Sequence, residues 1–192
     1  MNAPIHLSDG TWLLPALLLG IPLLWLVLTY NGLITCRNRM RNAASSIDVQ
    51  LKKRHDLIPN LVETVRGYMR HERELLERVV QLRAEAASRR IGDPARMAEE
   101  SGIGNCLGQI RALAEAYPDL KAAGHFTMLM RSLNEIEEQI SASRRSYNAA
   151  VEQMNNKVES FPSNLVARLF GFGLAAFFEA IESDRAVPGV RM

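Results

Sequence analysis

The sequence of 192 residues is long enough for one domain with an appended segment and too short for two full domains. Lys and Arg total 23 and Asp and Glu total 21, so the net charge of +2 gives no general attraction for nucleic acid, and no nucleic-acid partner is predicted. The two cysteines, Cys36 and Cys106, belong to no C-x-x-C pair, which excludes a structural zinc finger and a disulfide-rich scaffold.

After an N-terminal segment, residues 1–10, comes a long apolar stretch. Residues 11–30 read TWLLPALLLGIPLLWLVLTY, close to the roughly 20 residues that span a bilayer as a helix. We expect Trp12 and Tyr30 at the two membrane interfaces, where amphipathic rings are favoured. A cleaved signal peptide would need a basic n-region and an A-x-A site, and a buried core helix would need a polar face. The stretch therefore predicts an uncleaved, single-pass transmembrane helix, with the lipid bilayer as a partner.

Basic residues are concentrated just after this stretch and predict the orientation of the anchor. No Lys or Arg precedes Arg37, and residues 30–54 then hold six basic residues against Asp48 alone, a local net charge of +5. These six are Arg37, Arg39, Arg41, Lys52, Lys53 and Arg54. Since basic flanks stay in the cytoplasm, the N-terminus should lie outside the bacterial cytoplasmic membrane and the domain in the cytoplasm. We also place Arg37, Arg39 and Arg41 at the anionic membrane surface. A solvated helix face is the alternative, and we favour it for the trio at 52–54.

Residues 31–162 are predicted to form a helical domain. Apolar residues recur there at a period near 3.6, and no segment shows the alternation of apolar and polar residues that is typical of a strand. The last of four segments is the clearest, with intervals of three and four that are typical of a helical-bundle or coiled-coil seam. Its predicted inner face is Phe126, Leu129, Leu133, Ile136, Ile140, Ser143, Tyr147, Ala150, Met154, Val158 and Phe161.

Proline and glycine predict where the helices end. Pro59 lacks an amide donor and disfavours helix at the preceding residue, so a turn or kink is expected there. The pair Asp93-Pro94 is a helix start signal, and Pro118 and Pro162 are expected to follow helix ends. Residues 100–108, ESGIGNCLG, are the weakest helical stretch, and we favour local looseness over close helix contact at Gly104 and Gly108.

Residues 163–192 form an apolar tail with few charges. If the chain turns at Pro59, counting helices returns the end of the fourth helix to the bilayer. The tail aromatic residues would then lie at the membrane surface as an interfacial element. These are Phe170, Phe172, Phe177 and Phe178. If Pro59 only kinks one long helix, the tail ends far from the membrane instead. The alternative, that the tail covers the open end of the bundle core, stays open, and both can hold together.

No catalytic, cofactor-binding or metal-binding residues are predicted. The histidines do not form the Glu-x-x-His pairs of di-iron bundles, and His71-Glu72 is not completed as a zinc motif because Leu75 stands at the second histidine position. Phosphate-binding and serine-nucleophile motifs are also missing. His55 and His71 are expected to be exposed or capping residues.

The segment 47–61 carries more mixed charge and apolar character than a simple turn requires. One interpretation is that it closes the end of the bundle, with Asp56 as a cap. The other is a docking corner for a protein partner. The candidate docking residues are Asp48, Gln50, Lys52, Lys53, Arg54, Asp56, Pro59 and Asn60.

Three stretches resemble the LemA family of bacterial proteins. They are YNGLITCRNRMRNAASSIDVQLKKRHDLIPNLVETVRGYMRHE from residue 30, ALAEAYPDLKA from residue 112, and RRSYNAAVEQMNNKVESFPSNLVARLFGF from residue 144. The resemblance runs from about Tyr30 to Glu179 and implies an all-α fold, with one N-terminal transmembrane helix followed by an antiparallel up-and-down four-helix bundle. It supplies no established enzymatic activity. The chain departs from the family at Gly173, where Lys is frequent, and in the glycine-rich stretch 100–108.

Two functions of different classes are compatible with these features. The first is a non-catalytic, membrane-anchored interaction or scaffold protein with an unidentified protein partner, self-association or a role in membrane-protein quality control. The second is a ligand carrier or enzyme whose site lies between helices without a known motif. Because the catalytic motifs are missing, the sequence favours the first, and no cofactor is predicted.

Overall fold

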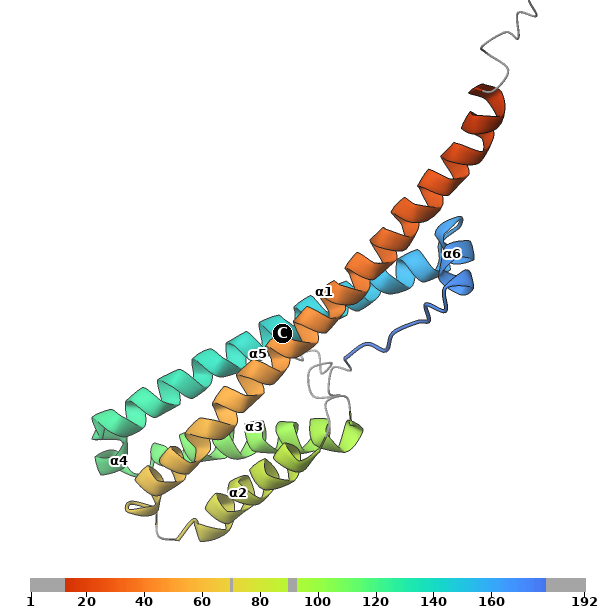
Figure 1. Cartoon of the computed structure of the whole chain (residues 1–192). Helices are drawn as coiled ribbons and strands as arrows, with labels where there is room; N and C mark the ends of the chain where they lie inside the picture. Colours follow the sequence, from red (N-terminus) through yellow and green to blue (C-terminus); the bar gives the residue numbers. More distant parts are fainter. Residues whose placement is uncertain (1–12, 70, 90–92, 179–192) are drawn as a thin grey trace, which may run out of the picture. The chain divides into compact units, whose positions relative to one another are not determined.

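The computed structural model describes residues 13–69, 71–89 and 93–178, and all regular structure in these ranges is α-helical (Figure 1). The helices are α1 (Leu13–Arg66), α2 (Arg73–Ser88), α3 (Pro94–Ala114), α4 (Pro118–Ala122), α5 (Gly124–Glu159) and α6 (Ser163–Leu169). The all-α prediction is therefore confirmed, while the antiparallel up-and-down order of a four-helix bundle stays a prediction. Trp12 and residues 1–10 lie outside the described residues.

The chain divides into two compact units. The central unit is Ala44–Arg144, and the terminal unit combines Met1–Ala43 with Arg145–Met192. Helices α1 and α5 contribute residues to both units, because the boundaries fall inside them. Each unit has its own apolar core.

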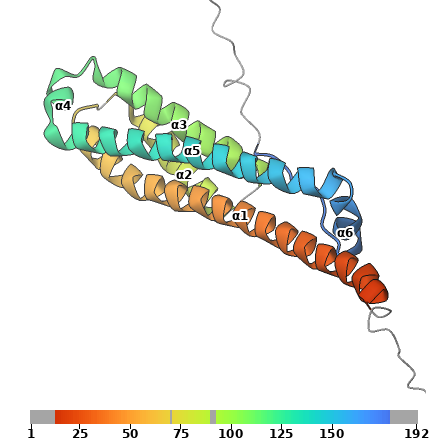
Figure 2. The ribbon, with the colours of Figure 1, turned by 90° about the horizontal axis from the view of Figure 1, so that it is seen from above.

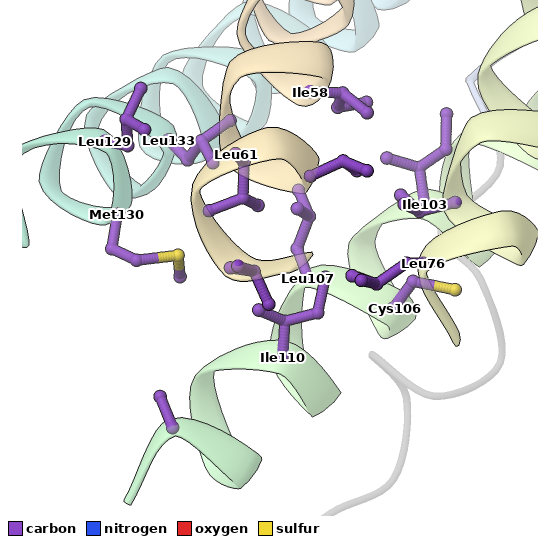
Figure 3. Packing of buried hydrophobic residues seen from close by; sticks show 14 of the residues in the cluster. Ile58, Leu61, Leu76, Ile103, Cys106, Leu107, Ile110, Leu129, Met130 and Leu133 are labelled. Atoms are coloured by element: carbon purple, nitrogen blue, oxygen red, sulfur yellow. The ribbon is translucent and has the colours of Figure 1, made fainter. Parts of the chain in front are cut away.

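The core of the central unit draws on α1 to α5, and Figure 3 shows its side chains turned toward one another between the helices. Its buried members include Ile58, Leu61, Val65, Leu76, Val79, Leu82, Ile103, Leu107, Ile110, Leu120, Phe126, Leu129 and Leu133. On α5, Ile136 and Ile140 are buried as well, so the inner face predicted for this segment is confirmed there. Phe161 was wrongly assigned to it, because α5 ends at Glu159 and leaves that ring 80% exposed.

The turn predicted at Pro59 is wrong, because α1 continues through it to Arg66. In an α-helix the amide of residue 59 would donate to the carbonyl of His55, and proline cannot. Instead Nε of Arg83, on α2, donates to the His55 carbonyl oxygen at 2.7 Å. A neighbouring helix thus satisfies the group that proline leaves unpaired, and α1 ends at Arg66, before α2 begins at Arg73.

Replacing Arg83 by methionine should reveal this compensation. Methionine keeps an apolar stem but leaves the His55 carbonyl without its donor, which should lower the free energy of unfolding by about 1–3 kcal/mol. In a Pro59→Ala background the alanine amide can serve the carbonyl, so Arg83→Met should cost clearly less. Urea unfolding of the four variants of this double-mutant cycle measures the difference. An equal cost in both backgrounds would contradict the compensation.

The glycine-rich stretch 100–108 lies within the continuous helix α3, and the favoured looseness is wrong there. A Cβ at Gly102 would lie 2.9 Å from Cδ1 of Leu82, so glycine at this position permits close approach of α3 to α2. These two helices lie side by side in both views (Figures 1 and 2). The start of α3 is as predicted, since the Asp93 carboxylate accepts the Ala95 amide at 2.9 Å and caps the helix.

The terminal unit has a smaller core made by α1, α5, α6 and the segment that follows α6. Its buried members are Leu33, Cys36, Met154, Val166, Ala167 and Phe172. Tyr30, Ile34 and Val158 pack against it. After α6 the chain is extended and runs back beside α5, as both views show (Figures 1 and 2).

Candidate functional site

Most of the residues in segment 47–61 that were predicted to contact a protein partner have exposed or partly exposed side chains. The side chains of Lys52, Lys53, Asp56, Pro59 and Asn60 are exposed, and those of Asp48 and Gln50 are partly exposed. All of them lie on α1 within the central unit. Because the helix continues through Pro59, these residues form a helix surface rather than a corner between two helices.

Arg54 does not belong to this surface. Its side chain is only 1% exposed, its Nη1 donates to Oε2 of Glu137 at 2.7 Å, and its Nη2 donates to the carboxylate and, at 3.0 Å, to the carbonyl of Glu100. The reason is its place on α1, three residues after Leu51 and four before Ile58, which puts it on the inner stripe. Assigning Arg54 to the docking surface was therefore wrong.

Arg54 is the centre of a buried charged cluster that joins α1, α3 and α5. Nε2 of His55 lies 3.0 Å from Oε1 of Glu100, although it is not aligned for a hydrogen bond. Arg96 lies with Nη2 at 3.4 Å from Oδ1 of Asp48 and Nε at 3.8 Å from Oε1 of Glu100. His55 is buried, so its predicted exposure is wrong, whereas His71 is exposed as expected.

The pKa values of the buried Glu100 and of the partly exposed Asp48 are shifted in opposite directions. Burial favours the neutral form of Glu100, but His55 and the Arg54 guanidinium outweigh it, so the pKa of Glu100 lies below its ordinary value. Burial raises the pKa of Asp48; Arg96 opposes this and Glu100 adds to it, and the net shift is upward. The cluster therefore favours the ionised form of Glu100.

This arrangement is suited to fixing the helices against one another. Glu100 and Asp48 each face a guanidinium, and the described residues hold no group of three or more His, Cys, Asp or Glu side chains placed to bind a metal ion. A buried ion pair contributes little net stability against an apolar equivalent but disfavours arrangements that leave its charges unpaired. We interpret the cluster as a determinant of helix register.

Replacing Glu100 by glutamine should destabilise the protein in a pH-dependent way. Because the folded state lowers the pKa of Glu100, its contribution is complete above the ordinary carboxyl pKa and is lost as pH falls through the lower folded value. At pH 7 we expect Glu100→Gln to cost about 1–3 kcal/mol, and the gap to wild type should narrow in acid. Urea midpoints at several pH values measure it. A gap that is constant or widens toward low pH would contradict the assignment.

The N-terminal part of α1 is the candidate membrane segment. It is long and apolar enough to cross a membrane by length and composition, and it is the one helix of the described residues that meets this test. Its large apolar side chains between residues 17 and 28 are mostly exposed, from 37% at Trp25 to 75% at Leu18. An apolar helix surface of this kind is compatible with lipid contact.

The basic residues that follow this helix segment differ in their surroundings. Arg39 and Arg41 are exposed, and Nη1 of Arg39 lies 3.3 Å from Oε1 of Gln153. Arg37 is partly buried, with its guanidinium carbon 4.9 Å from the ring centre of Phe172, a cation–π contact. Contact of these arginines with anionic headgroups stays a prediction.

The four tail aromatics are not equivalent. Phe172 is buried, with its ring 6.0 Å from that of Tyr30, so placing it at the membrane surface was wrong. The apolar neighbours on α1 and α6 cover it. Phe170 and Phe177 are about half exposed, and Phe178 is partly buried with its ring 6.4 Å from that of Tyr147. Phe170 and Phe177 therefore remain the candidates for membrane contact.

A groove of about 540 Å³ in the central unit is the place that an inter-helix ligand site would occupy. Its floor is apolar, with Ala114, Phe126 and Met130, and its walls carry charges of both signs. The charged lining residues are Arg111, Glu115, Lys121, Arg131, Glu135 and Glu138. Its polar lining also includes Thr127 and Asn134.

Comparison with known proteins gives one family. The LemA family model matches residues 43–192. The chain is 28% identical to Protein LemA of Metamycoplasma hominis, over 81% of this chain and 71% of that protein. It is 25% identical to Magnetosome protein MamQ 2 of Paramagnetospirillum magneticum, over 80% of this chain and 66% of that protein. It is 24% identical to Magnetosome protein MamQ of Magnetospirillum gryphiswaldense, over 80% of this chain and 65% of that protein.

Proposed function

The chain belongs to the LemA family, and on that premise we propose that it is a non-catalytic, membrane-anchored interaction protein of the bacterial cytoplasmic membrane. The observation that carries the proposal is on α1. One continuous helix presents an exposed apolar stretch at residues 17–28 and exposed arginines at Arg39 and Arg41, and then enters the core of the central unit. The helix is thus suited to lipid at one end and to protein at the other.

The charge distribution supports an orientation. Basic residues follow the apolar stretch and none precedes it, and such residues stay on the cytoplasmic side. We therefore propose that the N-terminus lies outside and that the helical domain, which we take to be an antiparallel four-helix bundle, lies in the cytoplasm.

The interaction role is supported by the surface of α1. The buried Arg54 of this helix is paired with Glu100 of α3, whereas Lys52, Lys53 and Asp56 remain exposed. We propose that these exposed residues, with Pro59 and Asn60, contact a protein partner. Support of membrane-protein quality control is the role that we propose for this contact. The names of the relatives state no reaction.

Crosslinking in membranes tests this proposal. A variant with Lys52→Glu, Lys53→Glu and Asp56→Lys should lose crosslinked partners that the wild-type chain retains, because it reverses the local charge pattern. A matched control with Glu63→Lys and Arg66→Glu changes exposed charges on the same helix outside the segment. This control should retain the crosslinked partners. If the first variant folds normally and keeps every wild-type crosslink, partner binding by this surface is contradicted.

The groove between α3, α4 and α5 supports the alternative, a ligand carrier. A polar small molecule bound there would contact both acidic and basic side chains over an apolar floor. A Met130→Trp variant fills the floor of the groove and should leave the crosslinks unchanged if the interaction role is the right one.

A further inference from the structure

The extended segment after α6 is held on α5 by two asparagine side chains. Asn155 accepts the Ala175 amide at 2.8 Å and donates to the Ala175 carbonyl at 3.0 Å. Asn148 does the same for Phe178, with distances of 2.8 and 3.0 Å. Each asparagine therefore pairs with both main-chain groups of one residue, as a neighbouring β-strand would.

The spacing of the two asparagines matches an extended chain. Seven residues along a helix advance about 10.5 Å, and three extended residues span about 10 Å. Asn155 holds residue 175 and Asn148 holds residue 178, so the segment runs antiparallel to α5 and both pairs are satisfied in one register. The hydroxyl of Tyr147 adds a bond to the Ala176 carbonyl at 3.2 Å.

The attachment uses mainly the backbone of the segment. All five of these hydrogen bonds involve main-chain atoms of residues 175–178, whereas Leu174 is 61% and Phe177 is 52% exposed. Among the large apolar side chains of residues 173–178, only Phe178 is partly buried, with its ring 6.4 Å from that of Tyr147. The hydrogen bonds can be replaced by water and contribute only modestly. Release of the segment from its own α5 should cost little.

Two glycines lie at the start of the segment. Gly171 has a φ of 69°, a left-handed conformation that glycine adopts without strain, and a Cβ at Gly173 would meet no atom within 4 Å. The chain here can change direction with small steric cost. These glycines are therefore the place where the segment can turn away from α5.

We propose that Asn148 and Asn155 form a docking strip for an extended polypeptide and that its second occupant is the segment 173–178 of another copy, exchanged between neighbouring chains. The structure shows this segment bound to the two asparagines, and the same segment from another copy would form the same hydrogen bonds. The inference rests on the proposed function, because anchoring would confine the copies to one membrane plane.

Photocrosslinking between two differently tagged full-length chains tests the exchange. Phe177→p-benzoylphenylalanine places the crosslinker at an exposed position of the segment. Both chains carry it, and the crosslinking is done in native membranes. We expect a covalent dimer that carries both tags, joined from position 177 to α5. Asn148→Leu with Asn155→Leu should reduce it about ten-fold. Asn156→Leu, an exposed asparagine on the same helix, is the matched control and should leave it unchanged.

A synthetic peptide of residues 171–178 should compete with the crosslink. Methylation of the amides at positions 175 and 178 removes both donors to the asparagines and should abolish competition, whereas methylation at position 176 should not. Melting curves of the asparagine variants check that they fold.

Three results would overturn the exchange: crosslinks within one chain only, crosslinks only to other proteins, or a two-tag dimer that the double leucine variant retains. Carbonate extraction of the same membranes separates this from the proposed function. A chain that stays in the membrane without the two-tag dimer contradicts the exchange alone, whereas a chain that is extracted contradicts the anchor.

Discussion

Replacing Arg54 by methionine is expected to lower the free energy of unfolding by about 3–5 kcal/mol, the largest effect of any single change considered for this protein. The guanidinium is buried and bonded to the carboxylates of both Glu100 and Glu137. Methionine fills much of the volume but leaves Glu100 buried without its arginine. Urea unfolding of the full chain in detergent, followed by circular dichroism, measures the loss.

Two further variants show whether the buried pair is responsible. Lys53→Met removes the same charge from the neighbouring, exposed position and should change the midpoint little. Adding Glu100→Met to Arg54→Met removes the uncompensated acid and should recover much of the loss, because apolar replacement of a whole buried pair is tolerated. Equal losses for Arg54→Met and Lys53→Met would contradict the account of the cluster.

Truncating Ile140 to alanine is expected to cost about 2–5 kcal/mol. The side chain is fully buried, with no exposed surface, on the inner face of α5. Its removal loses apolar burial and leaves a cavity that the surrounding helices close only in part. The same urea experiment measures the loss.

Gln139→Ala is the control for Ile140, since it is the preceding residue on α5 and its side chain is exposed. It should leave the midpoint nearly unchanged, because alanine is a good helix former and no core contact is lost. If the two variants melt alike, the inner face of this helix has been assigned to the wrong residues.

Local signals predicted the helices well. The buried residues of α5 follow the intervals of three and four that the sequence shows, and Asp93 caps α3 at the predicted start. Both depend on residues close in the chain, so the sequence displays them directly.

The incorrect predictions share a different cause, which is that each residue contacts a side chain distant in the sequence. Pro59 stays helical because Arg83 supplies the missing donor, and that contact between α1 and α2 is visible only after folding. Arg54 was assigned to the surface by its charge, although its position between Leu51 and Ile58 indicates the core. Its position on the inner stripe of α1 was the signal available in the sequence. The acids that it binds, Glu100 on α3 and Glu137 on α5, could not be identified from the sequence.

The asparagine strip was also missed. Asn148 and Asn155 are seven residues apart, so the sequence places them on one face of α5, but asparagines on a helix are usually solvated. Only the extended segment beside them shows what they bind.

The membrane topology of the chain is the most direct test of its proposed role. A reporter enzyme that is active only outside the cytoplasmic membrane, fused after Met192, should be inactive, and a reporter active only in the cytoplasm should be active at the same position. Immunoblots of the membrane fraction confirm that both fusions are present in equal amounts. Activity of the external reporter at Met192 would contradict a cytoplasmic domain on a single N-terminal anchor.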